Sequence, residues 1–210
     1  MATKQDTESG KTGLPDIRDH TATPRIDSPV SATGIEGLDF IMRGGLTAAQ
    51  PTLLRGGPGT GKTIISLSFL CHGLDIGEPG VLVTFDESPQ ALIRHADAFG
   101  LNLSAHIEAG RARILDMRPD REEMTSGETL ELSAILVRIG HAIEQIGARR
   151  LVIDAIDGLE GAYIGVEKSL QFELRRVFDW IRERQTTTVI NIGEHGDFNR
   201  RYGIEDYITD

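Results

Sequence analysis

The sequence predicts an α/β fold in which a mostly parallel sheet is covered by helices on both faces. Five short runs rich in apolar and β-branched residues alternate with stretches whose apolar residues recur at helical spacing. Such alternation is typical of strands joined by crossover helices in a parallel sheet. A length of 210 residues suits one domain of ordinary size. The predicted strands cover residues 51–56, 81–85, 112–117, 149–156 and 187–192.

The N-terminal part of the chain changes character near residue 30. Residues 1–30 are mostly polar or charged, show no apolar periodicity and are predicted to form a disordered tail. Residues 33–42 predict a short helix, which the following glycines end. The strand at 51–56 then enters a glycine-rich loop, and a helix follows over residues 64–74. Residues 31–210 are therefore expected to form the folded domain.

The next elements carry clear boundary signals. After the β-branched strand at 81–85, Ser88 is expected to be the N-cap of a helix and Pro89 its first residue. This helix is expected to stop at Gly100, a residue type suited to the C-terminal position. A third strand then follows over residues 112–117.

The second half of the predicted domain repeats the alternation. Apolar residues at helical spacing predict helices over residues 129–146 and 170–181. Between them lies the strand at 149–156, whose Arg149 and Arg150 are expected at a solvated end or in pairs with a neighbour's acids. Trp180 lies off the apolar stripe of its helix, so it is expected either at a subunit boundary or in a local surface contact.

Composition excludes several classes of protein. The formal net charge is −10 and the isoelectric point is near 5.1, which disfavours a nucleic-acid-binding role. No apolar run approaches the roughly 18 residues of a membrane helix, and no signal segment opens the chain. Cys71 is the only cysteine and is expected to be a small packed side chain. These features favour a cytoplasmic protein without a membrane partner.

The segment from Gly56 to Thr63 fits the pattern G-x-x-x-x-G-K-T, and it lies between a predicted strand and a predicted helix. In this context the pattern is typical of a loop that wraps nucleotide phosphates, because its glycines let backbone N–H groups converge on phosphate oxygens. The lysine can neutralise the β- and γ-phosphates of ATP. The alternative is a glycine-rich turn without a ligand. The predicted nucleotide-binding residues are Gly57, Pro58, Gly59, Thr60, Gly61, Lys62 and Thr63.

Beside such a loop, Mg²⁺ also needs an acidic ligand from the end of an apolar strand. Asp154 ends the apolar stretch "LVID" and fits this position. A carboxylate there can hold the metal opposite the hydroxyl of Thr63, so these two residues are the predicted metal ligands. Asp154 could instead cap the following loop. Asp157 is interpreted as a loop carboxylate.

Asp86 and Glu87 follow the strand at 81–85 and are the predicted catalytic residues. Ligands of open α/β sheets bind at the carboxyl ends of the strands, where this acidic pair can position the water that attacks the γ-phosphate. The alternative is a role at the N-terminus of the next helix. Asn191, near the end of the last strand, is expected either to sense the γ-phosphate or to cap a loop.

Five segments occur in the order found in the KaiC family of RecA-like ATPases, which this chain resembles from about Ala32 to Asp210. They are "TGIEGLD…GGL", "GGPGTGKT", "VTFDESPQ", "RRLVIDAI" and "RYGIEDYITD". The resemblance implies a RecA-like P-loop core that binds ATP with Mg²⁺. It also implies assembly of copies of the chain into a ring, by resemblance a hexamer, and signalling or clock-type protein partners.

The chain departs from that family in several ways. The usual Glu-Glu pair is Asp86-Glu87 here, and members of the family continue beyond the segment that ends at Asp210. The extra strands carry basic residues that reach a neighbour's nucleotide, so residues 31–210 are expected to be a truncated core. The sequence contains one P-loop, and nothing in it resembles a phosphoacceptor segment, so protein-kinase activity has no support.

The predicted function is slow, Mg-dependent ATP hydrolysis that acts as a nucleotide-driven switch. The first alternative is a recombinase-like, DNA-dependent ATPase. It would need cationic loops after Asp154, and in residues 157–169 the acidic residues outnumber Lys168. The second alternative is a nucleotide-binding module without significant turnover.

Overall fold

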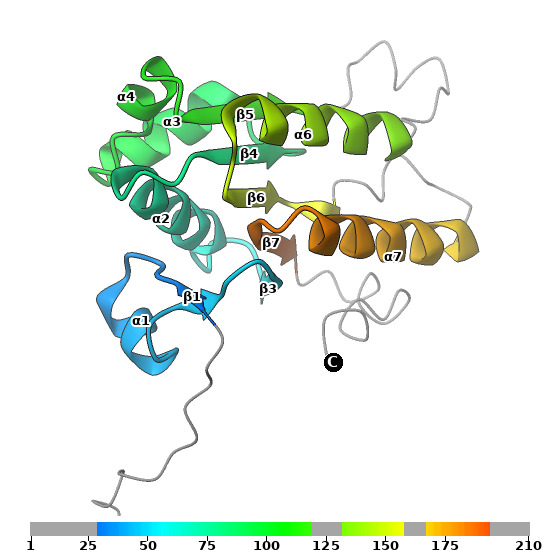
Figure 1. The fold of residues 1–210 in the computed structure, drawn as a ribbon, viewed down its shortest axis with the longest axis horizontal. Helices are drawn as coiled ribbons and strands as arrows, with labels where there is room; N and C mark the ends of the chain where they lie inside the picture. The colour runs from blue at the N-terminus through cyan, green and yellow to red at the C-terminus, as the bar shows by residue number, and fades with distance from the viewer. Residues whose placement is uncertain (1–28, 119–131, 158–166, 194–210) are drawn as a thin grey trace, which may run out of the picture.

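The structure is a computed structural model that describes residues 29–118, 132–157 and 167–193 (Figure 1). The predicted disordered tail lies outside the described residues apart from its last two positions, and the segment "RYGIEDYITD" lies wholly outside them. None of the described helices is long and apolar enough to cross a membrane.

The core is a five-stranded parallel sheet with the strand order β3-β7-β6-β4-β5. All five predicted strands are confirmed, with small shifts at their ends. The order places β7, the last described strand along the chain, between the strand that enters the glycine loop and β6. The strands are β3 (Pro51–Gly56), β4 (Gly80–Thr84), β5 (Ala112–Asp116), β6 (Arg150–Asp154) and β7 (Thr187–Gly193).

Helices cover both faces of this sheet, as the sequence predicted (Figure 1). One apolar layer joins the sheet to α2 (Lys62–Asp75), α3 (Pro89–Ala98) and α4 (Leu103–Glu108). The opposite layer joins it to α6 (Leu132–Ile146) and α7 (Glu167–Glu183). Neighbouring strand residues point to opposite faces, and the two core layers accordingly draw alternate residues from each central strand.

The start and stop signals around α3 are confirmed. Ser88 has an extended backbone, and its side chain accepts a hydrogen bond from the Ala91 N–H at 3.3 Å. Pro89 is the first helical residue. Gly100, just beyond the helix, has φ = 76°, a conformation that glycine adopts without a steric penalty.

The sequence did not predict a small two-stranded antiparallel sheet, formed by β1 (Val30–Ser31) and β2 (Leu46–Thr47), nor the helix α4. The predicted helix near residue 36 is confirmed as α1 (Glu36–Ile41). This small sheet is tied to the five-stranded sheet through Thr187, whose hydroxyl lies 3.0 Å from the Ser31 hydroxyl and accepts a hydrogen bond from the Ala49 N–H.

Arg150 corrects the expectation of a solvated arginine at the start of β6. Its side chain is 1% exposed, and its Nε donates to Glu78 Oε2 at 2.7 Å. Its Nη1 donates to the backbone oxygens of Ala32 and Phe69 at 2.8 and 2.5 Å, and its guanidinium lies 4.5 Å from the centre of the Phe69 ring. The prediction holds only for Arg149, which is exposed.

Two other side chains resolve open expectations. Trp180 is half-buried and packs against the core layer of α6 and α7, and the Arg184 guanidinium lies over its ring at 4.8 Å, so the expected local contact is present, while a place at a subunit boundary stays a prediction. Cys71 is a packed side chain, as predicted, with 1% exposure. Burial raises the pKa of the Cys71 thiol to about 12, and the negative charges of Asp75 and Asp97 act in the same direction.

Candidate functional site

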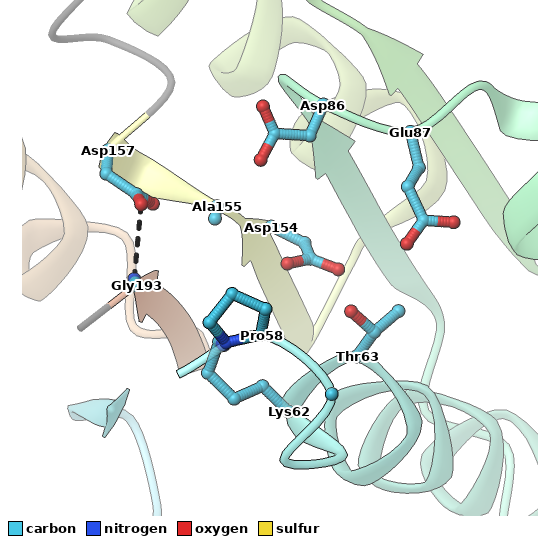
Figure 2. A pocket seen from close by; sticks show the side chains of 10 residues that line it. Pro58, Lys62, Thr63, Asp86, Glu87, Asp154, Ala155, Asp157 and Gly193 are labelled. Atoms are coloured by element: carbon cyan, nitrogen blue, oxygen red, sulfur yellow. Dashed lines mark hydrogen bonds between the residues drawn. The ribbon is translucent and has the colours of Figure 1, made fainter. Parts of the chain in front are cut away.

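A pocket with a volume of about 300 Å³ lies at the carboxyl ends of the strands, beside the start of α2 (Figure 2). This is the edge at which open α/β sheets bind ligands. The pocket gathers most of the predicted site residues from four separate parts of the chain. Its lining residues are Pro58, Gly59, Lys62, Thr63, Asp86, Glu87, Asp154, Ala155, Asp157 and Gly193.

The glycine loop joins the end of β3 to the start of α2. Gly59 and Gly61 have φ angles of 76° and 89°, values that side chains with a Cβ rarely adopt. The Thr60 hydroxyl closes the loop by donating to the Gly57 carbonyl at 2.8 Å. A Cβ on Gly56 would lie only 2.6 Å from that hydroxyl oxygen, so the close approach requires glycine there. The loop therefore presents backbone rather than side chains toward a ligand.

Lys62, the first residue of α2, is held against this loop. Its Nζ donates to the backbone oxygens of Gly56 and Gly57 at 2.7 and 3.0 Å. An ammonium group has three donors, so two neutral carbonyls do not exhaust it. The N-terminus of α2 adds unpaired N–H groups and a favourable dipole for an anion. Of the predicted nucleotide-binding residues, Pro58, Gly59, Lys62 and Thr63 line the pocket, whereas Gly57, Thr60 and Gly61 shape the loop.

The two predicted metal ligands line the same pocket. Thr63 comes from the first turn of α2, and Asp154 ends β6 beside Thr84 of β4. Asp154 is 9% exposed, and its peptide bond with Ala155 is cis. A hydroxyl and a carboxylate are hard oxygen donors, which suit Mg²⁺. No group of three or more His, Cys, Asp or Glu side chains that could hold a metal occurs among the described residues. Mg²⁺ commonly binds through one or two protein ligands together with water and phosphate, so this donor set fits the ion.

Asp86 and Glu87 lie where β4 leaves the sheet, and both line the pocket. In Figure 2 their carboxylates diverge: that of Asp86 points toward the side of the pocket where Asp157 lies, and that of Glu87 points toward Thr63. The backbone oxygen of Glu87 accepts a hydrogen bond from the Thr84 hydroxyl at 2.7 Å. The side chain that caps α3 is Ser88, so neither carboxylate of the acidic pair serves as the N-cap of that helix.

Asp157 is a lining residue whose place in the pocket the sequence did not predict. Its Oδ2 accepts a hydrogen bond from the Gly193 N–H at 3.2 Å, which ties the end of β7 to the segment after β6 (Figure 2). Its Oδ1 is buried and has no hydrogen-bond partner among the described residues. The sequence feature that could have predicted this is the position of Asp157, three residues after Asp154 and close to the carboxyl end of β6.

Asn191 matches neither of the two roles expected for it. Its side chain is fully buried between β7 and α2, where Oδ1 accepts a hydrogen bond from the Ser66 hydroxyl at 2.7 Å. It is not among the residues that line the pocket. Asn191 therefore supports the helix that carries Lys62 and Thr63.

The charges of the pocket favour a metal–anion complex over a bare anion. Four carboxylates line it, from Asp86, Glu87, Asp154 and Asp157, and Lys62 is the one positively charged lining side chain in the described part of the chain. Four negative charges and one positive charge leave a formal charge of −3. Since unlike charges attract and like charges repel at these short ranges, a polyphosphate that enters with a divalent cation meets less repulsion here than a bare one.

Comparison with known proteins agrees with this arrangement. The family model for the KaiC ATPase matches residues 31–210. The circadian clock protein KaiC2 of Synechocystis sp. is 38% identical over 182 residues, which are 85% of this chain and 31% of the relative. The circadian clock oscillator protein KaiC of Synechococcus elongatus is also 38% identical over 182 residues, which are 85% of this chain and 35% of the relative.

The chain spans about a third of the length of the curated relatives it matches. The family match nevertheless covers all five strands of the parallel sheet and the whole pocket. The parallel sheet, the glycine loop before α2 and the family match together show a RecA-like P-loop ATPase fold. The chain belongs to the KaiC family of ATPases.

Proposed function

We propose that this domain binds Mg·ATP in the pocket and hydrolyses it slowly, and that the bound nucleotide acts as a switch in a ring of identical chains. Nucleotide binding and ATPase activity in general are properties of the family. The observation that carries the finer proposal is the convergence of Lys62, Thr63, Asp154 and the acidic pair on one pocket.

Each group in the pocket has a chemical task in this proposal. The backbone N–H groups of the glycine loop and the Lys62 ammonium bind the β- and γ-phosphates. Thr63 and Asp154 hold Mg²⁺, which when bound neutralises charge on the phosphates. Asp86 and Glu87 hold the attacking water, and one of them accepts its proton as the new P–O bond forms and the bond from the γ-phosphorus to the bridging oxygen breaks, which releases ADP.

Slow turnover follows from the shortage of cations. Among the described residues, Lys62 is the sole cationic side chain that lines the pocket. Within the described residues, the charge that develops on the γ-phosphate is therefore met by Lys62, Mg²⁺ and backbone donors. An arginine supplied by a neighbour can raise phosphoryl-transfer rates by about 10³–10⁵, so a neighbouring subunit offers the natural means of regulation.

The assembly and its partners are also part of the proposal. Two relatives described above carry the names of circadian clock proteins. For this chain we propose a homo-oligomeric ring, a hexamer by resemblance, with signalling or clock-type protein partners in the cytoplasm. The net charge of −10 argues against nucleic acid as a partner.

The test combines light scattering after gel filtration with single-turnover hydrolysis, with and without Mg·ATP. We expect a larger assembly with Mg·ATP, weak binding when EDTA replaces Mg²⁺, and a turnover loss of about 10²–10⁴-fold in Asp86→Asn/Glu87→Gln. ATP binding that ignores Mg²⁺ would refute the metal role. A double variant as fast as the parent would remove the acidic pair from catalysis, and DNA-stimulated turnover would favour the recombinase-like alternative.

A further inference from the structure

The carboxylate of Glu87 has an identified partner outside the pocket. Its Oε2 lies 3.2 Å from Nδ1 of His95, a residue of the second turn of α3. The backbone of the same residue is held by the Thr84 hydroxyl. Glu87 is thus fixed at both ends, by β4 through its carbonyl and by α3 through its carboxylate.

The chemistry of this 3.2 Å contact determines which ring nitrogen must carry a proton if His95 is to attract Glu87. An ionised carboxylate only accepts hydrogen bonds, so the ring nitrogen that faces it must donate. A neutral His95 that attracts this carboxylate would therefore carry its proton on Nδ1. A neutral histidine in this pair must leave Nε2 unprotonated, on the ring edge that does not face Glu87.

The direction in which Glu87 is held gives the contact a consequence for the site. Figure 2 shows the Glu87 carboxylate pointing toward Thr63, whereas the Asp86 carboxylate points toward the side of Asp157. Thr63 is the proposed metal ligand on that side of the pocket. A carboxylate kept near it can accept hydrogen bonds from the water ligands that Mg²⁺ usually retains.

We propose that His95 is a positioning residue, which holds Glu87 on the metal side of the pocket and so separates the tasks of the two acidic residues. This inference rests on the proposed Mg·ATP site. The effect is modest in size, because the side chains of His95 and Glu87 are 54% and 38% exposed. Exposed ion pairs bias a conformation by about two- to five-fold.

The first test needs no nucleotide. Long-range ¹H–¹⁵N correlation spectra of the full chain at about pH 8.5, above the usual range of histidine pKa values, report which ring nitrogen is protonated. We expect the His95 signals, identified through His95→Leu, to show a protonated Nδ1 that reverts toward Nε2–H in Glu87→Ala. An unprotonated Nδ1 in the parent chain overturns the proposal.

The second test measures the Mg²⁺ concentration for half-maximal binding of a fluorescent ATP analogue. We expect His95→Leu to raise it by about two- to five-fold. His95→Asn, whose amide can donate from a place near Nδ1, should restore the parent value. His141→Leu, at an exposed position on α6, is the matched control and should leave it unchanged.

A double variant separates positioning from a general structural effect. If His95 acts through Glu87, His95→Leu adds no further shift in a Glu87→Ala background. A full additive shift overturns the proposal. Failure of the underlying Mg·ATP site has a different signature: Lys62→Ala would then bind the analogue as well as the parent, while the His95 spectrum would still show the protonated Nδ1.

Discussion

The two ends of helix α2 hold two cations in opposite ways. At its N-terminus the Lys62 ammonium contacts the backbone oxygens of Gly56 and Gly57 and lines the pocket. Toward its C-terminal end the Arg150 guanidinium is 1% exposed and is bound by Glu78, by two backbone oxygens and by the face of the Phe69 ring.

The difference shows what distinguishes a cationic side chain that binds a ligand from one that stabilises the fold. The partners of Lys62 belong to one short loop and are neutral, so a phosphate can replace them with little loss of stability. The partners of Arg150 come from three separated parts of the chain and include a carboxylate. The planar fork of arginine suits such simultaneous contacts, whereas the compact ammonium of lysine suits exchange between partners.

The largest effect on the free energy of unfolding is expected from substitution of Arg150. Arg150→Leu removes the charge that Glu78 and two carbonyls were arranged to meet, and breaking buried ion pairs lowers the free energy of unfolding by about 3–5 kcal/mol. Denaturant unfolding measures this loss. Arg149→Leu, at the exposed neighbouring position, is the matched control and should change it by less than about 0.5 kcal/mol. Equal stabilities of the two variants would mean that the Arg150 contacts are not structural.

Lys62→Ala should lower ATP affinity and leave the free energy of unfolding nearly unchanged, the opposite of the effect expected for Arg150→Leu. Hydrogen bonds to charged groups contribute about 1.5–3 kcal/mol, so ATP affinity should fall by about 10- to 150-fold. The free energy of unfolding without nucleotide should hardly change, since only two loop carbonyls lose a partner. Calorimetry and denaturant unfolding measure the two quantities. Unchanged affinity would remove Lys62 from the phosphate site, and a large loss of stability would erase the contrast with Arg150.

Gly73→Ala tests how tightly α2 packs around the guanidinium. A Cβ at this position would overlap the Nε and Cδ atoms of Arg150, which is itself fixed by its partners. Overpacking of this kind lowers the free energy of unfolding by about 1–3 kcal/mol. Gly37→Ala is the matched control, because a Cβ there meets nothing within 4 Å. Equal thermal midpoints for the two variants would show that Arg150 can move aside.

The smallest effect concerns the pH dependence of stability near Cys71. Its pKa is raised to about 12 in the folded chain from an ordinary value of 9.0. The folded state therefore retains a proton that the unfolded state releases above pH 9, and stability falls as pH rises through that window. We expect Cys71 to lower the free energy of unfolding by about 1 kcal/mol between pH 8 and pH 10. The same titration of Cys71→Ala should be flatter, and parallel curves would exclude the thiol as the cause.

Local patterns were enough to predict the layers of the fold and most of the residues that line the pocket. The apolar runs gave five strands at their correct places, and the glycine pattern between a strand and a helix located the loop. Asp86 and Asp154 were found because parallel strands end at one edge, so residues far apart in sequence meet there. The roles assigned to these side chains stay predictions.

What could not be predicted depends on contacts between distant parts of the chain. Arginine is usually exposed, and the burial of Arg150 follows from Glu78 and the carbonyl of Ala32, which lie 72 and 118 residues away. Asn191 neither lines the pocket nor caps a loop, because its side chain is buried and accepts a hydrogen bond from Ser66 of α2. The contact between Glu87 and His95 required the path of α3, and the strand order has no local signal.

The order of the strands has a consequence for how the protein is made. Among the strands of the parallel sheet, a ribosome delivers β3 first and β7 last, yet the sheet places them side by side, pairing Pro51 with Thr188 and Gly56 with Gly193. On a growing chain β4, β5 and β6 can pair before β7 has emerged from the exit tunnel, whereas β3 has no neighbour in the described sheet until then. The glycine loop at the end of β3 is therefore secured last, and a nascent chain gains its nucleotide site only after residue 193 is free to join the sheet.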